Sequence, residues 1–304
     1  MGIEIGKDTD FRKDAPYDLL ILGQPSLDIN VDYTGDTVHN VGGAVVYSGY
    51  SAASTGAKVA VVPKCNPEEV DLNAVFGKAN VTVLPIRSPR STSIQNVYHT
   101  ADRERRTCTA ISLIEPYRVE EIPDVEAKIY QIAGLIKGDL GNEIIAYAAK
   151  KSAAAVDVQC LLRCAENGSM VFHDWAEKKE YLPMIRFLKT DAAEAEVLTG
   201  LSDRYAAAKQ LYDWGAREIM ITHNTEALIY DGKEIYVSPL VPRNLTGRTG
   251  RGDTIFAAYL CERLTKDIPE ALEYAAALVS LKMETVGPFM GTRADVEAYR
   301  KQFY

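Results

Sequence analysis

The sequence predicts an α/β fold with a mainly parallel central sheet. Short apolar runs that end in turn residues alternate with helix-like segments, beginning with 18–23, 43–55 and 58–62. This alternation favours right-handed βαβ units, in which a helix connects two parallel strands. The chain has 304 residues, of which 47% are hydrophobic, and it contains no repeat and no Gly/Ser linker. We therefore expect one domain over residues 1–304 with a sizeable core.

Buried strands are expected where short apolar runs stand between turn residues. These runs are 18–23, 58–62, 81–85, 129–133, 154–158, 187–189 and 218–222. Helices are expected between the strands and in the C-terminal third, at 43–55, 67–76, 142–151, 194–198, 204–214, 254–264, 269–283 and 293–303. Asp231-Gly232 separates 227–230 from 233–237, which is a strong signal of a β-hairpin.

Two regions interrupt the alternation. Residues 29–33 follow the first strand directly, and 92–98 and 105–111 flank a polar turn at 101–103. We expect these regions, about 29–40 and 90–112, to form a small antiparallel flap. Ligands of parallel sheets bind at the carboxyl ends of the strands, so a flap there would act as a lid that excludes water. An ordinary hairpin is the alternative.

The composition argues against several classes of function. A net charge of −8 argues against nucleic-acid binding, which requires a surplus of Lys and Arg. No stretch approaches the ~20 apolar residues of a membrane-spanning helix, and the polar residues 1–10 do not resemble a signal peptide. Five sparsely spaced cysteines favour reduced thiols over disulfides or a zinc site. We expect a cytoplasmic protein that binds neither nucleic acid nor membrane.

The most informative segment is 247–253, Gly-Arg-Thr-Gly-Arg-Gly-Asp, which directly precedes an apolar helix-like run. Glycines let backbone amides turn toward one point, and the first amides of a helix have no internal partners, so the segment suits a phosphate. Asp253 at its edge could accept a proton from an attacking hydroxyl. A single acid there would usually be a helix cap, but a cap does not need three glycines. Phosphate binding beside a base is what a small-molecule kinase needs.

This segment resembles the DTxGAGD signature of the ribokinase family of carbohydrate kinases, also called the PfkB type. The resemblance implies a ribokinase-like three-layer α/β/α fold with a small β lid. It also implies that Asp253 is the base that activates the acceptor hydroxyl. The backbone amides of Gly250, Arg251 and Gly252 would form the anion hole.

The segment departs from the signature at its start. Gly247 and Arg248 stand where the family has Asp and Thr, which puts the family's monovalent-cation site in doubt. Arg248 and Arg251 would offset phosphate charge, or else both would point to solvent.

On the acceptor side, Asp28 resembles the family's sugar-binding Asp after the first strand; closing a turn is the alternative. Gly42 and Gly43 resemble the double glycine where the backbone approaches the sugar; a plain helix-start turn is the alternative. The apolar residues that follow them differ from the ribose-type contact set. Gln159 and Arg163 resemble the family's DxNxR segment, with Gln in place of Asn as in members resembling inositol kinases.

On the donor side, Asp191 and Glu194 resemble the NxxE motif, in which Glu194 would support Mg²⁺ through water. A capping box is the alternative, and both can hold. Residues 275–280 resemble the helix that lines the adenine pocket, and close helix packing is the alternative there. The other residues that we expect at the nucleotide are Thr222, Arg248, Thr249, Ala277 and Ser280.

These resemblances imply an ATP- and Mg²⁺-dependent kinase that phosphorylates an alcohol group of a sugar or related polyol. Its partners would be the acceptor and the nucleotide, and it would form a homodimer through the lid. A nucleoside or inositol kinase on the same fold is one alternative. A non-catalytic sugar-sensing protein is another, although a sensor has no need of Asp253.

Overall fold

The computed structural model describes residue 12, residues 14–100 and residues 106–304. The predictions for residues 1–10 and for the polar turn at 101–103 therefore lie outside the described residues. None of the helices in this described part has the length and apolarity that crossing a bilayer requires. All five cysteines are described, and all are free thiols.

The body of the molecule is built on a nine-stranded sheet. Its strands run parallel except at one edge, where a hairpin of residues 226–239 adds antiparallel strands. The central strand is completely buried from Leu19 to Leu22, as expected for a sheet covered on both faces. The sheet order is β17 (Ile235–Pro239), β16 (Glu226–Tyr230), β15 (Glu218–Thr222), β14 (Ile185–Asp191), β11 (Ala153–Asp157), β10 (Ala127–Ile132), β1 (Tyr17–Leu22), β4 (Val59–Val62) and β6 (Val81–Val83).

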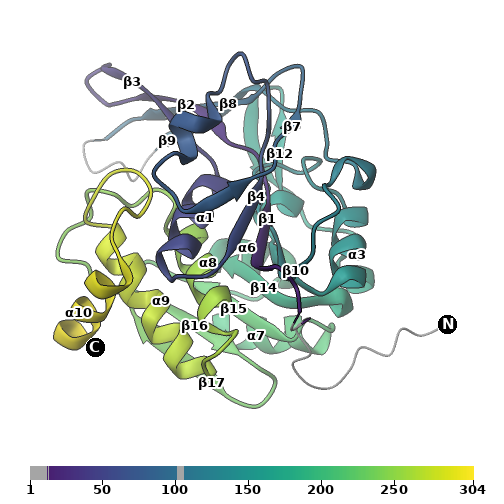
Figure 1. Ribbon diagram of the computed structural model, residues 1–304, viewed down its shortest axis with the longest axis vertical. Coiled ribbons are helices and arrows are strands. Elements are labelled where there is room, and N and C mark those ends of the chain that lie inside the picture. The colour runs from purple at the N-terminus through teal and green to yellow at the C-terminus, as the bar shows by residue number, and fades with distance from the viewer. Residues whose placement is uncertain (1–11, 13, 101–105) are drawn as a thin grey trace.

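Helices cover both faces of this sheet, which gives three layers (Figure 1). One hydrophobic core lies under α1 (Ala44–Ser54), α2 (Leu72–Phe76), α8 (Arg251–Glu262), α9 (Ile268–Lys282) and α10 (Arg293–Phe303). The other core lies under α3 (Asn142–Lys151), α4 (Gln159–Leu162), α5 (Lys178–Tyr181), α6 (Ala192–Thr199) and α7 (Arg204–Asp213). The predicted α/β fold with a mainly parallel sheet is confirmed.

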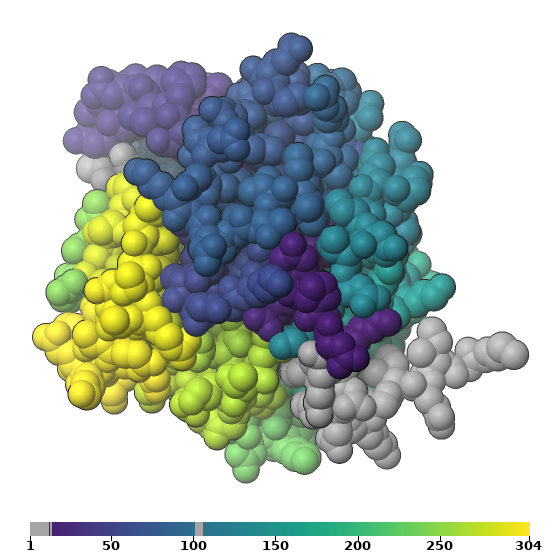
Figure 2. Space-filling model, in the orientation of Figure 1, coloured from purple at the N-terminus to yellow at the C-terminus, as the bar shows by residue number. Residues whose placement is uncertain are grey.

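A second sheet of six strands contains both regions that were predicted to form a lid, and we call this sheet the lid. Its order is β12 (Arg163–Glu166), β13 (Ser169–Phe172), β9 (Arg106–Ser112), β8 (Thr92–Tyr98), β2 (Ser26–Val31) and β3 (Thr37–Gly42). Strand β2 pairs antiparallel with β3 but parallel with β8, so the lid is mixed rather than purely antiparallel. In Figure 2 the β2–β3 region projects from the body as a separate lobe at the upper left. Minor elements are β5 (Lys64–Cys65), β7 (Ile86–Arg87) and the 3₁₀ turns Val119–Glu121 and Leu182–Met184.

Several element boundaries differ from those expected. Helix α2 covers only the end of the predicted 67–76, because the side chain of Asp71 accepts from two amides and starts the helix at Leu72. Strand β2 starts at Ser26 instead of residue 29, which places Asp28 within a strand and not in a turn. The hairpin β12–β13 was not predicted. Its turn has Asn167 at φ 50° and Gly168 at φ 84°, the Asn-Gly signal of a tight hairpin that the sequence does contain.

Candidate active site

A cavity of about 450 Å³ lies between the lid and the carboxyl ends of the central strands. The lid, the ends of β14 and β15, and the segment before α8 all contribute to its walls. Its lining residues are Ser26, Asp28, Gly43, Ala44, Tyr47, Ile94, Asn96, Tyr98, Arg106, Leu135, Gln159, Arg163, Lys189, Asp191, Thr222, Leu245, Thr246, Arg248, Thr249, Gly250, Arg251, Gly252 and Asp253. The cavity therefore joins most of the residues that the sequence predicted separately.

The first turn of α8 faces this cavity. Gly250 caps the helix in the left-handed region at φ 77°, and a Cβ there would lie 2.2 Å from Tyr47 Cδ1, so only glycine fits. The helix begins at Arg251, three residues before the predicted start, so Asp253 lies within the first turn. The amides of Arg251 and Gly252 have no acceptor among the described residues. They are available to an anion at the positive end of the helix.

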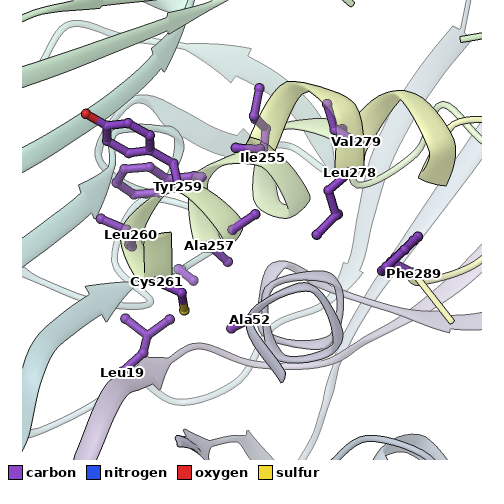
Figure 3. Packing of buried hydrophobic residues seen from close by; sticks show 14 of the residues in the cluster. Leu19, Ala52, Ile255, Ala257, Tyr259, Leu260, Cys261, Leu278, Val279 and Phe289 are labelled. Atoms are coloured by element: carbon purple, nitrogen blue, oxygen red, sulfur yellow. The ribbon is translucent and has the colours of Figure 1, made fainter. Parts of the chain in front are cut away.

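Close packing fixes the position of α8. Figure 3 shows side chains of this helix, among them Ile255 and Cys261, packed among residues of α1, α9 and β1. Ser51 of α1 donates a 2.7 Å hydrogen bond to the Thr254 carbonyl. The first turn of α8 is thus held rigidly against the body, as a preorganised anion site requires.

The carboxyl group of Asp253 lies at the cavity wall. Burial raises its pKa to about 6, and the neighbouring carboxylate of Asp157 adds to the increase. The ammonium groups of Lys189 and Lys282 act in the opposite direction. Asp253 is therefore ionised near neutral pH and still basic enough to accept a proton.

Lys189 is a residue of the cavity to which the sequence assigned no role. It is 5% exposed, it lines the cavity, and its Nζ atom lies 2.9 Å from the Asp157 carboxylate. Burial by itself would lower the pKa of Lys189, but Asp157, Glu194 and Asp253 together raise it above the usual value. Lys189 thus stays charged among three acids. Asp157 and Lys189 are register partners at the ends of β11 and β14, which sequence spacing does not reveal.

Asp28 and the double glycine form one end of the cavity. A Cβ on Gly42 would lie 2.5 Å from Asp28 Oδ2, so the glycine leaves room for the carboxylate. Gly43 has φ 103° and starts α1, and a Cβ there would collide with the backbone of Gln24. Burial raises the pKa of Asp28 to about 6, against hydrogen bonding from Ser26 and the charges of two arginines.

Those two arginines, Arg163 and Arg106, line the same end of the cavity as Asp28. Arg163 is the first residue of β12, and its guanidinium donates to Sγ of Cys108 in β9 at 3.6 Å. Gln159 donates to the Leu135 carbonyl at 3.4 Å. This end offers several charged and amide groups in a small space. Arg106, Ser26 and Asn96 join Asp28, Gln159 and Arg163 there, although the sequence singled out only the last three.

The other end of the cavity is positively charged. Arg248 and Arg251 both line it, which excludes the alternative that both point away to solvent. Arg251 donates to the Asn224 side chain at 3.0 Å. Burial and the nearby Arg248 lower the pKa of Arg251, as expected for two cations held close together. Thr222 and Thr249 lie at the same end.

Asp191 and Glu194 form a capping box at the start of α6. Glu194 N donates to Asp191 Oδ1 and Asp191 N donates to Glu194 Oε2, both at 2.8 Å. Asp191 lines the cavity, whereas Glu194 is 3% exposed behind it, and burial raises the pKa of Glu194. The capping alternative is therefore present in the structure, and Asp191 is the member of the pair that a ligand would meet.

The structure does not bring Ala277 and Ser280 to this cavity. Both are completely buried in α9. The Ser280 hydroxyl accepts from Val241 N at 2.9 Å and lies 3.0 Å from the hydroxyl of Tyr304. Tyr304 also donates to the Pro239 carbonyl at 2.8 Å. Close helix packing, the alternative for these small residues, is what is observed.

Comparison with known proteins identifies the family. Residues 68–291 match the model of the pfkB family carbohydrate kinases, which covers more than half of the chain. The chain belongs to the pfkB family. The cytidine kinase of Thermococcus kodakarensis is 25% identical over 255 residues, 80% of this chain and 87% of its own.

Solved structures agree with this assignment. A pyrophosphate-dependent kinase in the ribokinase family, in a sulfate complex, is 32% identical, with a TM-score of 0.85 over 92% of this chain and 99% of its own. Arabidopsis thaliana ribokinase complexed with ribose and ATP shares the fold at 16% identity, with a TM-score of 0.74 over 94% of this chain and 99% of its own. This pfkB protein is thus a ribokinase-like phosphotransferase of the carbohydrate, nucleoside and inositol kinase group. The non-catalytic sensor is not supported.

The pfkB assignment leaves the metal site to be judged from the side chains. The described residues contain no cluster of three His, Cys, Asp or Glu that could hold an ion by themselves. Mg²⁺ needs only one or two carboxylates when phosphates and waters complete its shell. Asp191 at the cavity wall, with Glu194 behind it, fits such a shared site. A metal would therefore be held jointly by this pfkB kinase and its phosphate donor.

Proposed function

We propose that this pfkB kinase transfers a phosphoryl group from pyrophosphate to a hydroxyl of a cyclic polyol of the inositol class. The observation that carries the donor assignment is the pair of arginines beside the open amides of α8. A short, highly charged donor would be held by these groups alone. A relative at 32% identity is described as complexed with a pyrophosphate analog and myo-inositol, which supports the same pair of substrates here.

ATP, the donor expected from the sequence, is the second candidate. Its phosphates would use the same amides and arginines, but its base needs a further pocket. The expected adenine contacts at Ala277 and Ser280 lie in the core, and Tyr304 covers Ser280. The Arabidopsis ribokinase, which was solved with ribose and ATP, shares only 16% identity. These points favour the smaller donor.

The acceptor end of the cavity favours a ligand with many hydroxyl groups. Asp28, Asn96 and Gln159 can each bond hydroxyls as donors, acceptors or both, and Arg163 adds further donors. A nucleoside is the second candidate, because Tyr47, Ile94 and Tyr98 provide a partly apolar wall and the Thermococcus relative is a cytidine kinase.

In the proposed reaction, Asp253 accepts the proton of the acceptor hydroxyl as its oxygen attacks the terminal phosphorus. A new P–O bond forms, the bridging P–O bond breaks, and its electron pair leaves with the departing phosphate. The amides of Gly250, Arg251 and Gly252 stabilise the charge on the transferring group, which is worth ~2.7–4 kcal/mol per donor in comparable sites. Mg²⁺ held at Asp191 would neutralise charge on the donor phosphates.

A matrix of donors and acceptors tests this proposal. Pyrophosphate and ATP, each with Mg²⁺, are combined with myo-inositol, ribose, fructose 6-phosphate and cytidine, and products are measured by mass spectrometry. We expect the highest kcat/KM for pyrophosphate with myo-inositol. Turnover with ATP but not with pyrophosphate would overturn the donor assignment, and a preference for cytidine over myo-inositol would overturn the acceptor assignment.

The pH dependence follows from the raised pKa of Asp253. The base must be ionised, so kcat should fall as the pH decreases through about 6, a higher value than the ordinary 3.8 of an Asp would give. Protonation of Asp28, whose pKa is also raised to about 6, should increase the KM for the acceptor over the same range. Initial rates from pH 4.5 to 8 at several acceptor concentrations separate the two effects. A kcat that stays level down to pH 4.5 would contradict the assignment of Asp253.

A cytoplasmic location and a homodimer through the lid remain proposals. Four large apolar side chains on the lid strands are more than a third exposed: Val38, Val41, Ile111 and Phe172. Burying this area between two lids would favour a dimer. Light scattering at micromolar concentration should give twice the mass of the chain, and a monomer mass would refute the dimer.

A further inference from the structure

Lys282, the last residue of α9, is a completely buried lysine next to the anion site. Its Nζ atom donates to the Gly247 carbonyl at 2.6 Å and also to the Thr249 carbonyl. The same ammonium lies 5.0 Å above the ring of Tyr47, the residue that packs against Gly250. Lys282 is thus hydrogen-bonded to both ends of the segment 247–249, which leads into the first turn of α8.

The hydrogen bonds of Lys282 Nζ within the described residues go to two backbone carbonyls and not to a carboxylate. Burial lowers the pKa of this lysine to about 8, and Asp253 opposes the decrease. Its partners are two carbonyl oxygens and an aromatic face, which are the ligands of a bound cation rather than those of a salt bridge. Asp253 offsets part of this charge from a distance, and the ammonium also acts on an anion bound at the α8 amides.

The end of α9 and the segment 247–249 are also joined through their backbones. Gly247 N donates to the Met283 carbonyl at 2.7 Å. A Cβ on Gly247 would lie 1.6 Å from the Thr285 carbonyl oxygen, so the chain can pass here only as glycine. The hydrogen bonds from Lys282, the backbone bond to Met283 and the close contact with Thr285 together fix the segment that precedes the anion hole.

We propose that the Lys282 ammonium is a built-in cation that holds segment 247–249 in its anion-binding shape and supplies the positive charge beneath the transferring phosphate. Lys282 is then a positioning residue, acting through the loop and not by contact with substrate. It takes the part that a bound monovalent ion would otherwise play. The replacement of the signature Asp and Thr by Gly247 and Arg248 is consistent with this, since a protein ammonium needs no acid or hydroxyl to recruit it. The inference needs only the kinase activity, with either donor.

The first test is the salt dependence of the enzyme. At constant ionic strength, the wild type should have the same kcat/KM, within about twofold, in potassium, sodium and tetramethylammonium chloride. A requirement for potassium or sodium would overturn the proposal, because it would show that an external ion occupies this position.

The second test removes the charge. Lys282→Met should lower kcat/KM for the donor by roughly tenfold to a hundredfold, the loss expected for a charged hydrogen-bonding group. The basic limb of the wild-type pH profile, near the lysine pKa of about 8, should disappear in this variant. Lys301→Met, which changes an exposed lysine in the last turn of α10, is the matched control and should have no effect on either.

The third test restores the charge from solution. Lys282→Ala leaves space for a small cation, so ethylammonium or potassium ions should increase its activity at least severalfold without affecting the wild type. Calorimetry on the same variants measures the affinity for pyrophosphate and for ATP. This affinity should decrease on substitution and recover when the cation is added, and the measurement does not require an acceptor. If Lys282→Ala is folded and no cation restores either donor binding or rate, the lysine is only structural and the proposal is wrong.

Discussion

Asp253→Asn is expected to lower kcat by ~10²–10⁴-fold, the range for loss of a general base. Asparagine keeps the size and hydrogen bonding of the side chain but cannot accept the proton of the acceptor hydroxyl. Donor binding should persist, because the amides of Arg251 and Gly252 and the two arginines are unchanged. Steady-state kinetics and calorimetry with pyrophosphate and with ATP measure the two effects separately.

The stability of this variant provides an independent check. The folded-state pKa of Asp253, about 6, lies above the ordinary 3.8, so ionisation at pH 7 opposes folding. Removing the charge should leave the melting temperature unchanged or higher. Asp295→Asn, at the equivalent third position of α10, is the control for loss of a helix-terminal acid and should leave kcat intact. Near-normal turnover of Asp253→Asn would show that another group takes the proton.

Lys189→Met is expected to have the largest effect on stability. It leaves Asp157, which is 4% exposed, as a buried carboxylate without its cation. Breaking a buried ion pair from one side typically costs ~3–5 kcal/mol of unfolding free energy. Urea unfolding at pH 7 would measure that loss.

Lys189→Met should also change the pH at which kcat declines on the acid side. Lys189 lowers the pKa of Asp253, so its removal should move the decline of kcat to higher pH. The double variant Lys189→Met/Asp157→Asn removes both charges and should recover part of the lost stability. A decrease in stability below ~1 kcal/mol, the size of an exposed pair, together with an unmoved acid limb, would refute the role given to this lysine.

Local patterns in the sequence predicted most of the fold. The apolar run ending at Gly23 and the hairpin at Asp231-Gly232 are specified by neighbouring residues, and both appear as expected. A helix directly after the glycine segment was predicted for the same reason, since the glycines and the acid lie within seven residues, although α8 begins at Arg251 and not at the predicted residue 254. Features of this kind need no knowledge of the sheet order.

The parts that were missed depend on contacts between distant segments. Lys189 meets Asp157 only because β14 lies beside β11, and Arg106 reaches Asp28 only because of how the lid strands are ordered. Ser280 shows the opposite case. Small residues at helical spacing fit a ligand pocket or a packed helix equally well, and only the position of Tyr304 decides between them. The pattern of residues along the chain does not reveal which distant segments come into contact.

Tyr47 lines the cavity on a helix that contacts both the lid and the segment before α8. Its helix, α1, follows directly after Gly42 and Gly43, of which Gly42 lies against Asp28, while the Tyr47 ring lies against Gly250 and 5.0 Å from Lys282 Nζ. A shift of this helix when one substrate arrives would be transmitted directly to the loop that receives the other. Such a shift would link the two substrate affinities, and the linkage would be reciprocal: the factor by which the acceptor changes the affinity for the donor equals the factor by which the donor changes the affinity for the acceptor.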